Sequence, residues 1–166
     1  MRAPEPLTLE HDVNSSDCGD TSLNSWLKTR ALKNENLGGS RTYVICIENK
    51  VIGYYALASG SIEHDKAPSQ VKRNMPAPIP VMILGRLGID KRCQGRRLGG
   101  FLLQDAILRI YQASKIVGVK AILVHALSER ARDFYVQHGF KSSPMDKMLL
   151  FLPLNEVEAI LNESML

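Results

Sequence analysis

The sequence predicts a mixed α/β or α+β fold in which helices flank a single sheet. Apolar residues make up 45% of the 166 residues and charged residues 23%, a balance typical of a globular protein and too apolar for intrinsic disorder. Segments with helical periodicity also alternate with β-type segments along the chain, as expected when helices cover a sheet. Because the length is close to that of one domain, we expect a single domain over residues 1–166.

The first expected element is a helix near the amino terminus. After Asp20, apolar residues recur at spacings of three and four, the period of a helix with one face toward the core. Asp20 and Thr21 are both candidate N-caps. The pattern ends near Asn36, before the Leu37-Gly38-Gly39 break that suits a helix stop.

A hairpin and a long connection are expected next. Two β-type segments, Arg41 to Glu48 and Val51 to Ser59, are separated by Asn49-Lys50, which indicates a tight turn. The stretch from Ile62 to Pro80 carries four of the eight prolines, so we expect an exposed connection there.

The second half of the chain alternates strands and helices. Ile79 to Ile89 is a mostly apolar run that predicts a buried strand, and a helix is expected from Gly99 to about Lys115. Ser128 is a candidate N-cap for a helix that Gly139 would end. The remaining elements are expected to be a strand at Lys120 to Leu127, a strand at Met148 to Leu152 and a short helix at Leu154 to Leu161.

The positive charge is concentrated in one segment. The chain has a net charge of +4, and the window from Lys72 to Arg97 holds seven basic residues with Asp90 as its single acid. This window therefore carries more than the whole excess, which favours a polyanionic ligand. The alternative is a solvated basic surface without a partner.

The termini and the cysteines favour a reducing cytoplasm. The amino-terminal residues MRAPEPLTLEHD lack the apolar stretch of a signal peptide, and we expect no membrane-spanning segment. The three cysteines are an odd number without CxxC spacing, so we expect neither a disulfide framework nor a zinc site.

The segment Arg92 to Gly100 is the strongest candidate for chemistry. It lies between an expected strand and an expected helix, where backbone N–H groups and the helix dipole form a receptor for phosphate. The chain has no GxxxxGK[ST], which excludes a P-loop, and this segment is not GxGxxG. A dinucleotide-binding site would also need an Asp or Glu at the end of the next strand, and this chain has neither there. The alternative is a plain strand-to-helix turn with solubilising arginines.

A second candidate lies in the helix that follows Ser128. Ala131, Phe134 and Tyr135 share one helical face, so Tyr135 is expected to point inward with a hydroxyl that needs a partner. Taken alone, a tyrosine at this helical spacing is most often a core residue.

These two segments together resemble a known family. Gln94-x-x-x-x-Gly99 after a buried strand, followed by helix, strand and the Ala-x-x-Phe-Tyr-x-x-x-Gly-Phe pattern at Ala131 to Phe140, resembles the GNAT superfamily of acyl-CoA-dependent N-acetyltransferases. Further segments are similar to its TacT-like toxin branch: Trp26-Leu27, Gly39 to Tyr43, Gly53 to Ala58, Pro78 to Met82 and Leu84 to Leu87.

The resemblance implies the GNAT fold, with splayed central strands that hold acetyl-CoA, and it implies roles for individual residues. Leu87, Gly88 and Ile89 would offer strand main chain to the pantetheine arm. Ser128 and Phe134 would lie beside the cofactor, and Tyr135 matches the catalytic tyrosine. The pyrophosphate would be held by Gln94, Gly95, Arg96, Arg97, Leu98, Gly99 and Gly100. One departure is that Arg97 stands where the family motif has its middle glycine.

The resemblance also implies a function. Members of this branch are toxins that acetylate the α-amino group of aminoacyl-tRNA, form homodimers and are neutralised by a ribbon-helix-helix antitoxin. The expected RNA phosphate contacts are Lys28, Arg30, Lys33, Arg73, Arg86, Lys91 and Arg92. Two alternatives remain open: a GNAT enzyme that acts on a small amine, a peptide or a ribosomal protein, and a non-catalytic RNA-binding regulatory module.

Overall fold

The computed structural model describes residues 2–165, with side chains as far as Leu161. The Cα positions group into two compact units, the first of residues 2–58 and 85–106 and the second of residues 59–84 and 107–165. Among the residues described, no helix has the length and apolar character needed to cross a bilayer.

The strands form the mixed sheet that the sequence predicts. Within the described residues, seven strands are hydrogen-bonded in the order β1-β2-β3-β4-β5-β7-β6. The pairs β1–β2, β2–β3, β5–β7 and β6–β7 are antiparallel, and β4 and β5 are parallel. The strands are β1 (Glu5–Pro6), β2 (Arg41–Ile47), β3 (Lys50–Ile62), β4 (Ile79–Ile89), β5 (Ala121–His125), β6 (Lys141–Ser142) and β7 (Leu149–Pro153).

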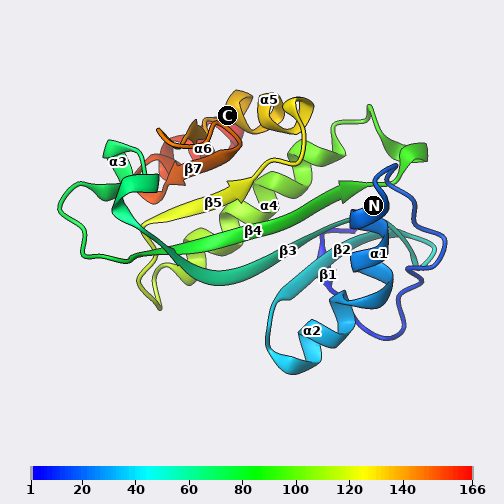
Figure 1. The fold of residues 1–166 in the computed structure, drawn as a ribbon. Helices are drawn as coiled ribbons and strands as arrows, with labels where there is room; N and C mark the ends of the chain where they lie inside the picture. The colour runs from blue at the N-terminus through cyan, green and yellow to red at the C-terminus, as the bar shows by residue number, and fades with distance from the viewer. Residues whose placement is uncertain (1, 166) are drawn as a thin grey trace. The chain divides into compact units, whose positions relative to one another are not determined.

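In the first unit, the expected amino-terminal helix is divided into two. Helix α1 (Thr21–Thr29) and helix α2 (Ala31–Leu37) meet at Arg30, whose φ of −122° and ψ of −31° interrupt the helical backbone (Figure 1). The N-cap is Asp20, whose side chain accepts hydrogen bonds from the amides of Ser22 and Leu23. Periodicity alone did not reveal the break, because the apolar stripe continues from Leu27 to the buried Ala31.

The hairpin of β2 and β3 supports these helices. Its turn consists of Glu48 and Asn49, with φ of 50° and 71°, so it lies one residue earlier than predicted. Two positive φ values are typical of the tight turns that join twisted strands. The core of this part is formed by one buried cluster from the amino-terminal segment, α1, α2 and the hairpin: Leu7, Leu27, Ala31, Val44, Val51 and Tyr54.

In the second unit, the connection between β3 and β4 is more ordered than the sequence predicted. The stretch expected to be an exposed connection, Ile62 to Pro80, contains a 3-10 turn at His64–Lys66 and helix α3 (Ser69–Lys72). Ala67 and Val71 are fully buried against β4, β5 and β7. The prediction of an exposed segment was therefore wrong at these two positions, since the prolines shape the turns while two apolar side chains enter the core.

The remaining elements follow the predicted order. A 3-10 turn (Lys91–Cys93) leads from β4 to helix α4 (Leu98–Ala113). Helix α5 (Glu129–Gln137) begins after Ser128 and is followed by Gly139 at a φ of 95°. The chain ends in a 3-10 turn (Leu154–Glu156) and helix α6 (Val157–Met165). The two-residue strands β1 and β6 were not predicted, because such short segments show no periodicity.

We expect Asp20→Ala to lower the free energy of unfolding by about 1 kcal/mol, because it removes the acceptor that caps α1. Hydrogen bonding to Ser22 lowers the pKa of Asp20 from its usual 3.8, so the folded protein binds this proton more weakly than the unfolded chain does. The stabilisation is therefore present above pH 4 and is lost as the pH falls through the folded-state pKa. Urea unfolding at pH 7 and near pH 3 measures both effects.

A matched control is Asp133→Ala, because Asp133 is a 68% exposed aspartate in the middle of α5 that caps no helix. Its unfolding free energy should stay within about 0.5 kcal/mol of the wild type. Equal stabilities of Asp20→Ala and the wild type at pH 7 would contradict the assignment of the cap.

Candidate active site

The turn between β4 and α4 contains two residues with left-handed backbone. Gly95 has a φ of 82°, and Arg97, immediately before α4, has a φ of 63°. A non-glycine residue at positive φ costs about 1–3 kcal/mol, so the surroundings must hold Arg97 in place. The arginine at the position of the family's middle glycine therefore adopts the left-handed backbone that glycine adopts easily.

This loop fits a diphosphate group. Leu98, Gly99 and Gly100 form the first turn of α4, where amide groups lack acceptors within the helix. Arg96 and Arg97 are exposed, and a Cβ placed on Gly95 would meet no atom within 4 Å. Unpaired amides, the positive end of a helix dipole and two guanidinium groups around open space are suited to bind phosphate oxygens.

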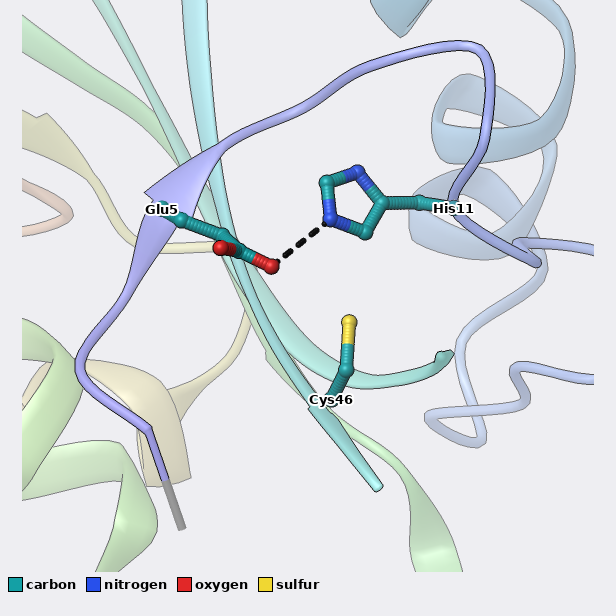
Figure 2. Close-up of side chains that lie close together, drawn as sticks. All are labelled: Glu5, His11 and Cys46. Carbon is teal, nitrogen blue, oxygen red and sulfur yellow. Dashed lines mark hydrogen bonds and ion pairs between the residues drawn. The ribbon is translucent and has the colours of Figure 1, made fainter. Parts of the chain in front are cut away.

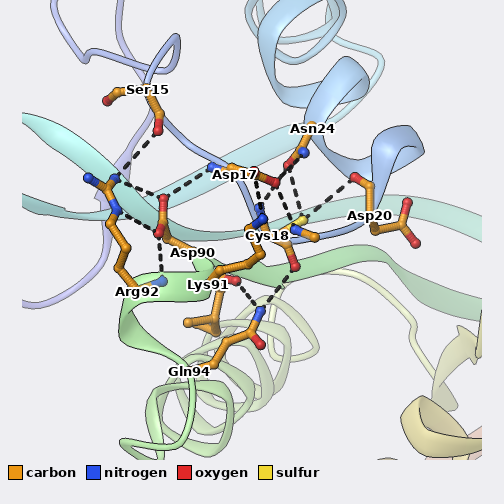
Figure 3. A network of polar contacts seen from close by, with 11 residues as sticks. Ser15, Asp17, Cys18, Asp20, Asn24, Asp90, Lys91, Arg92 and Gln94 are labelled. Carbon is orange, nitrogen blue, oxygen red and sulfur yellow. Dashed lines mark hydrogen bonds and ion pairs between the residues drawn. The ribbon is translucent and has the colours of Figure 1, made fainter.

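A buried carboxylate holds the beginning of the loop (Figure 3). Asp90 is only 2% exposed and accepts hydrogen bonds from the Arg92 amide (2.9 Å) and from Arg92 Nε (2.9 Å) and Nη2 (3.0 Å). It also accepts one from the Asp17 amide at 3.1 Å. These donors, first of all the Arg92 side chain, hold the pKa of Asp90 well below its usual value. We did not predict a role for Asp90, although its place as the single acid in a basic window was a signal.

The side chain of Gln94 is hydrogen-bonded within the protein. Its Nε2 donates to the carbonyl oxygens of Ile89 (2.9 Å) and Cys18 (3.0 Å). This nitrogen is therefore turned toward the protein's own backbone, and the binding of a pyrophosphate by Gln94 remains a prediction.

The strand that precedes the loop has its predicted place. The pairing of β4 with β5 covers Val81–Leu84, and β4 then continues through Leu87, Gly88 and Ile89. Gly88 is buried, and a Cβ there would be in van der Waals contact with Cys18 Sγ at 3.4 Å. The splay of the central strands and the binding of pantetheine remain predictions.

In the second unit, Tyr135 points inward as the sequence predicts. It is 7% exposed, and its ring packs edge-on against Phe134 and Phe140 with centroid distances of 5.2 and 5.4 Å. Burial raises the pKa of the Tyr135 phenol above its usual value of 10.0. The hydroxyl is therefore protonated at physiological pH and can act as a hydrogen-bond donor.

Ser128 and Phe134 occupy the start and the middle of the same helix. Ser128 Oγ accepts a hydrogen bond from the Ala131 amide at 3.1 Å, which confirms Ser128 as the N-cap. Phe134 is half-buried between Tyr135 and His138. Both are thus ordered by local contacts, and their roles beside the cofactor remain predictions.

The basic residues predicted to bind RNA differ in their surroundings. Lys28, Arg30 and Lys33 are exposed on α1, α2 and their junction, and Arg73 is exposed after α3. The guanidinium of Arg86 lies 5.3 Å from the ring centroid of Trp26. Lys91 pairs with Asp17 at 3.2 Å, and Arg92 pairs with Asp90. The charges of Lys91 and Arg92 are therefore already partly neutralised within the protein.

A second cluster of chemically active groups lies at the edge of β1 and β2 (Figure 2). Ligand atoms of Glu5, His11 and Cys46 lie within 4.8 Å of one another, beside a cavity of about 730 Å³ that Glu5 and Cys46 help to line. His11 Nδ1 accepts a hydrogen bond from the Thr8 amide (2.9 Å), so Nε2 carries the proton and donates to Glu5 (2.9 Å). Burial, with the Glu5 charge, raises the pKa of Cys46 to about 11. The cluster is thus a hydrogen-bonded pair beside a neutral thiol, and a metal ion would have to displace the Nε2 proton.

Comparisons with known proteins identify the family of this chain. Residues 38–142 match the family model described as the acetyltransferase (GNAT) domain. A tRNA-acetylating toxin of Mycobacterium tuberculosis is 47% identical over 161 residues, which cover 97% of this chain and 97% of that protein.

Two solved structures resemble the chain along nearly its whole length. The structure of AtaT complexed with acetyl-methionyl-tRNAfMet has a TM-score of 0.87 at 31% identity and covers 95% of this chain and 98% of that one. A tyrosine-to-phenylalanine mutant of AtaT, bound to acetyl-CoA and the C-terminus of the antitoxin AtaR, has a TM-score of 0.83 at 30% identity, covering 96% and 97%. With a family model over more than half of its residues and a relative 47% identical along nearly all of them, the chain belongs to the acetyltransferase (GNAT) family.

Proposed function

We propose that this protein is a toxin that transfers the acetyl group of acetyl-CoA to the α-amino group of aminoacyl-tRNA and thereby blocks translation. The observation that carries this proposal is the loop from Gln94 to Gly100, an anion receptor at the start of α4 in a chain 47% identical to a tRNA-acetylating toxin. The AtaT complexes with acetyl-methionyl-tRNA and with acetyl-CoA support it.

The loop would bind the diphosphate of acetyl-CoA, and the end of β4 would bind its pantetheine arm. Within the loop, the amides of Leu98, Gly99 and Gly100 and the guanidinium groups of Arg96 and Arg97 supply the donors. Leu87, Gly88 and Ile89 supply main-chain groups, and Ser128 and Phe134 would lie beside the cofactor.

The chemistry needs little from the protein beyond positioning and one proton donor. Acetyl-CoA supplies an activated acyl group as a thioester. The α-amino group has a pKa of about 7.7–8.0, so a useful fraction is unprotonated at neutral pH and can attack without a dedicated general base. Tyr135, whose raised pKa keeps its phenol protonated, would donate a hydrogen bond to the leaving sulfur. Complete proton transfer is uphill, because a thiol with a pKa of about 8.5 is the stronger acid.

The proposal extends to partners. An antitoxin that neutralises the enzyme is supported by the AtaT structure bound to the C-terminus of AtaR. The family likeness further implies that the antitoxin is of the ribbon-helix-helix type and that the enzyme is a homodimer. A cytoplasmic location follows from the proposed substrate, because aminoacyl-tRNA is used where translation takes place.

Incubation of the protein with radiolabelled acetyl-CoA and total aminoacyl-tRNA tests this function. We expect label on the amino acid carried by tRNA, and its identification by chromatography after deacylation gives the specificity. Deacylated tRNA is the matched control and should remain unlabelled. Label on added polyamines or on proteins, with none on tRNA, would instead establish one of the other GNAT activities.

We expect Tyr135→Phe to reduce turnover by about 100-fold or more while leaving acetyl-CoA affinity unchanged, because a positioned acid contributes at least that factor. Single-turnover rates and calorimetry measure the two quantities. Tyr111→Phe, which removes a hydroxyl that donates to Glu158, is the control and should keep full turnover. An unchanged single-turnover rate in Tyr135→Phe would remove this residue from the mechanism.

Replacing Lys28, Arg30 or Lys33 by alanine should weaken tRNA binding and reduce its salt dependence by about one unit of slope for each contact removed. The reason is that each exposed cation bound to a phosphate releases one condensed counterion. Binding isotherms between low and high salt give the slope. Lys115→Ala is the control, because this ammonium group lies over the ring of Tyr111. If the mutants and the wild type have the same slope, these residues do not contact phosphate.

A further inference from the structure

A continuous chain of hydrogen bonds joins the first turn of α1 to the loop after β4 (Figure 3). In α1, the side chain of Asn24 accepts from the Cys18 amide (2.9 Å) and donates to Asp17 Oδ1 (2.8 Å). The Asp17 amide in turn donates to Asp90, and the Lys91 amide donates to the Asp17 carbonyl oxygen at 2.8 Å.

The loop side of this chain is equally well connected. The Asp90 carboxylate receives three donors from Arg92, and Arg92 Nη2 also reaches the Ser15 carbonyl oxygen at 3.4 Å. Gln94 Nε2 adds a further connection, because it donates hydrogen bonds to the carbonyl oxygens of both Ile89 and Cys18. The segment 15–20 is therefore attached to the end of β4 and the loop at four residues, namely Asp90, Lys91, Arg92 and Gln94.

We propose that Asp90, Asn24 and Gln94 are positioning residues that hold the loop in the conformation that binds the diphosphate of acetyl-CoA. This inference rests on the proposed function, because it takes the loop from Gln94 to Gly100 as the diphosphate site. The loop contains two residues at positive φ, one of them the non-glycine Arg97, and such a backbone persists only where neighbouring contacts over-determine it. The network supplies those contacts on the strand side of the loop.

Because Asp90 is negatively charged, its replacement distinguishes a positioning effect on acetyl-CoA binding from a direct electrostatic effect. Removal of a negative charge near an anion site should tighten the binding of a polyanion. Loss of positioning should weaken it. Asp90→Asn therefore has opposite expected signs under the two accounts. Asn24→Ala changes no charge and lies on α1, outside the loop, so any weakening there must pass through the hydrogen-bonded chain.

The experiment measures the Kd of acetyl-CoA by calorimetry for the full-length protein and its variants. We expect Asp90→Asn and Asn24→Ala to raise this Kd by about tenfold, with kcat at saturating acetyl-CoA within about twofold of the wild type. The KM for S-acetylpantetheine, a donor without the diphosphate, should stay unchanged. A merely destabilised protein would lose activity with both donors alike.

Asp12→Asn is the matched control. Asp12 lies in the same amino-terminal segment, and its carboxylate accepts hydrogen bonds from the Asn14 amide and the Ser15 hydroxyl, two groups that make none of the bonds described above. Its Kd for acetyl-CoA should equal that of the wild type. If Asp90→Asn does not fold, Asn24→Ala carries the test, because Asn24 is only half-buried.

Arg96→Glu separates failure of this inference from failure of the proposed function. If Arg96→Glu weakens acetyl-CoA binding while Asp90→Asn tightens it, or while Asn24→Ala leaves it unchanged, the loop is the diphosphate site and the positioning role is overturned. If Arg96→Glu has no effect on acetyl-CoA binding, the site itself is wrong and the positioning role is overturned with it.

Discussion

The hydrogen bonds of the buried Asp90 carboxylate are the interactions on which we infer that the loop between β4 and α4 depends. A buried charge is costly unless several donors satisfy it. Here the donors come from Arg92, two residues further along the chain, and from Asp17, 73 residues earlier. One side chain thus joins the end of a strand to the segment that leads into α1, and the two residues at positive φ, Gly95 and Arg97, come a few positions further along the chain.

The chemistry of the proposed reaction is divided between two kinds of environment. The loop is exposed, cationic and rich in unpaired amides, as binding of a hydrated diphosphate requires. Tyr135 lies among aromatic rings, where burial raises the pKa of its phenol further above its usual value of 10.0. A buried arginine loop, by contrast, would bind anions only at a large cost of desolvation. Each group therefore lies in the surroundings that its role needs.

The basic residues also differ in whether a carboxylate of the protein pairs with them. Lys91 and Arg92 belong to the most basic window of the sequence, yet both face carboxylates, Asp17 and Asp90 respectively. Lys28, Arg30 and Lys33 lie outside that window and are exposed on α1, α2 and their junction. Net charge along the sequence thus indicates that a polyanion binds, whereas the availability of each cation depends on its neighbours in space.

Local signals in the sequence determined the element order, the caps at Asp20 and Ser128, the strand Ile79–Ile89, the loop before α4 and the inward face of Tyr135, because each depends on residues a few positions apart. The sequence missed the break at Arg30, the burial of Ala67 and Val71, and the bonds of Asp90 and Gln94. Only the tertiary structure decided the contacts of Asp90 with Asp17 and of Gln94 with Cys18, since these partners lie 73 and 76 residues away along the chain. A side chain that a motif predicts to bind a ligand can therefore hold the loop in place instead, and no local pattern distinguishes these two roles.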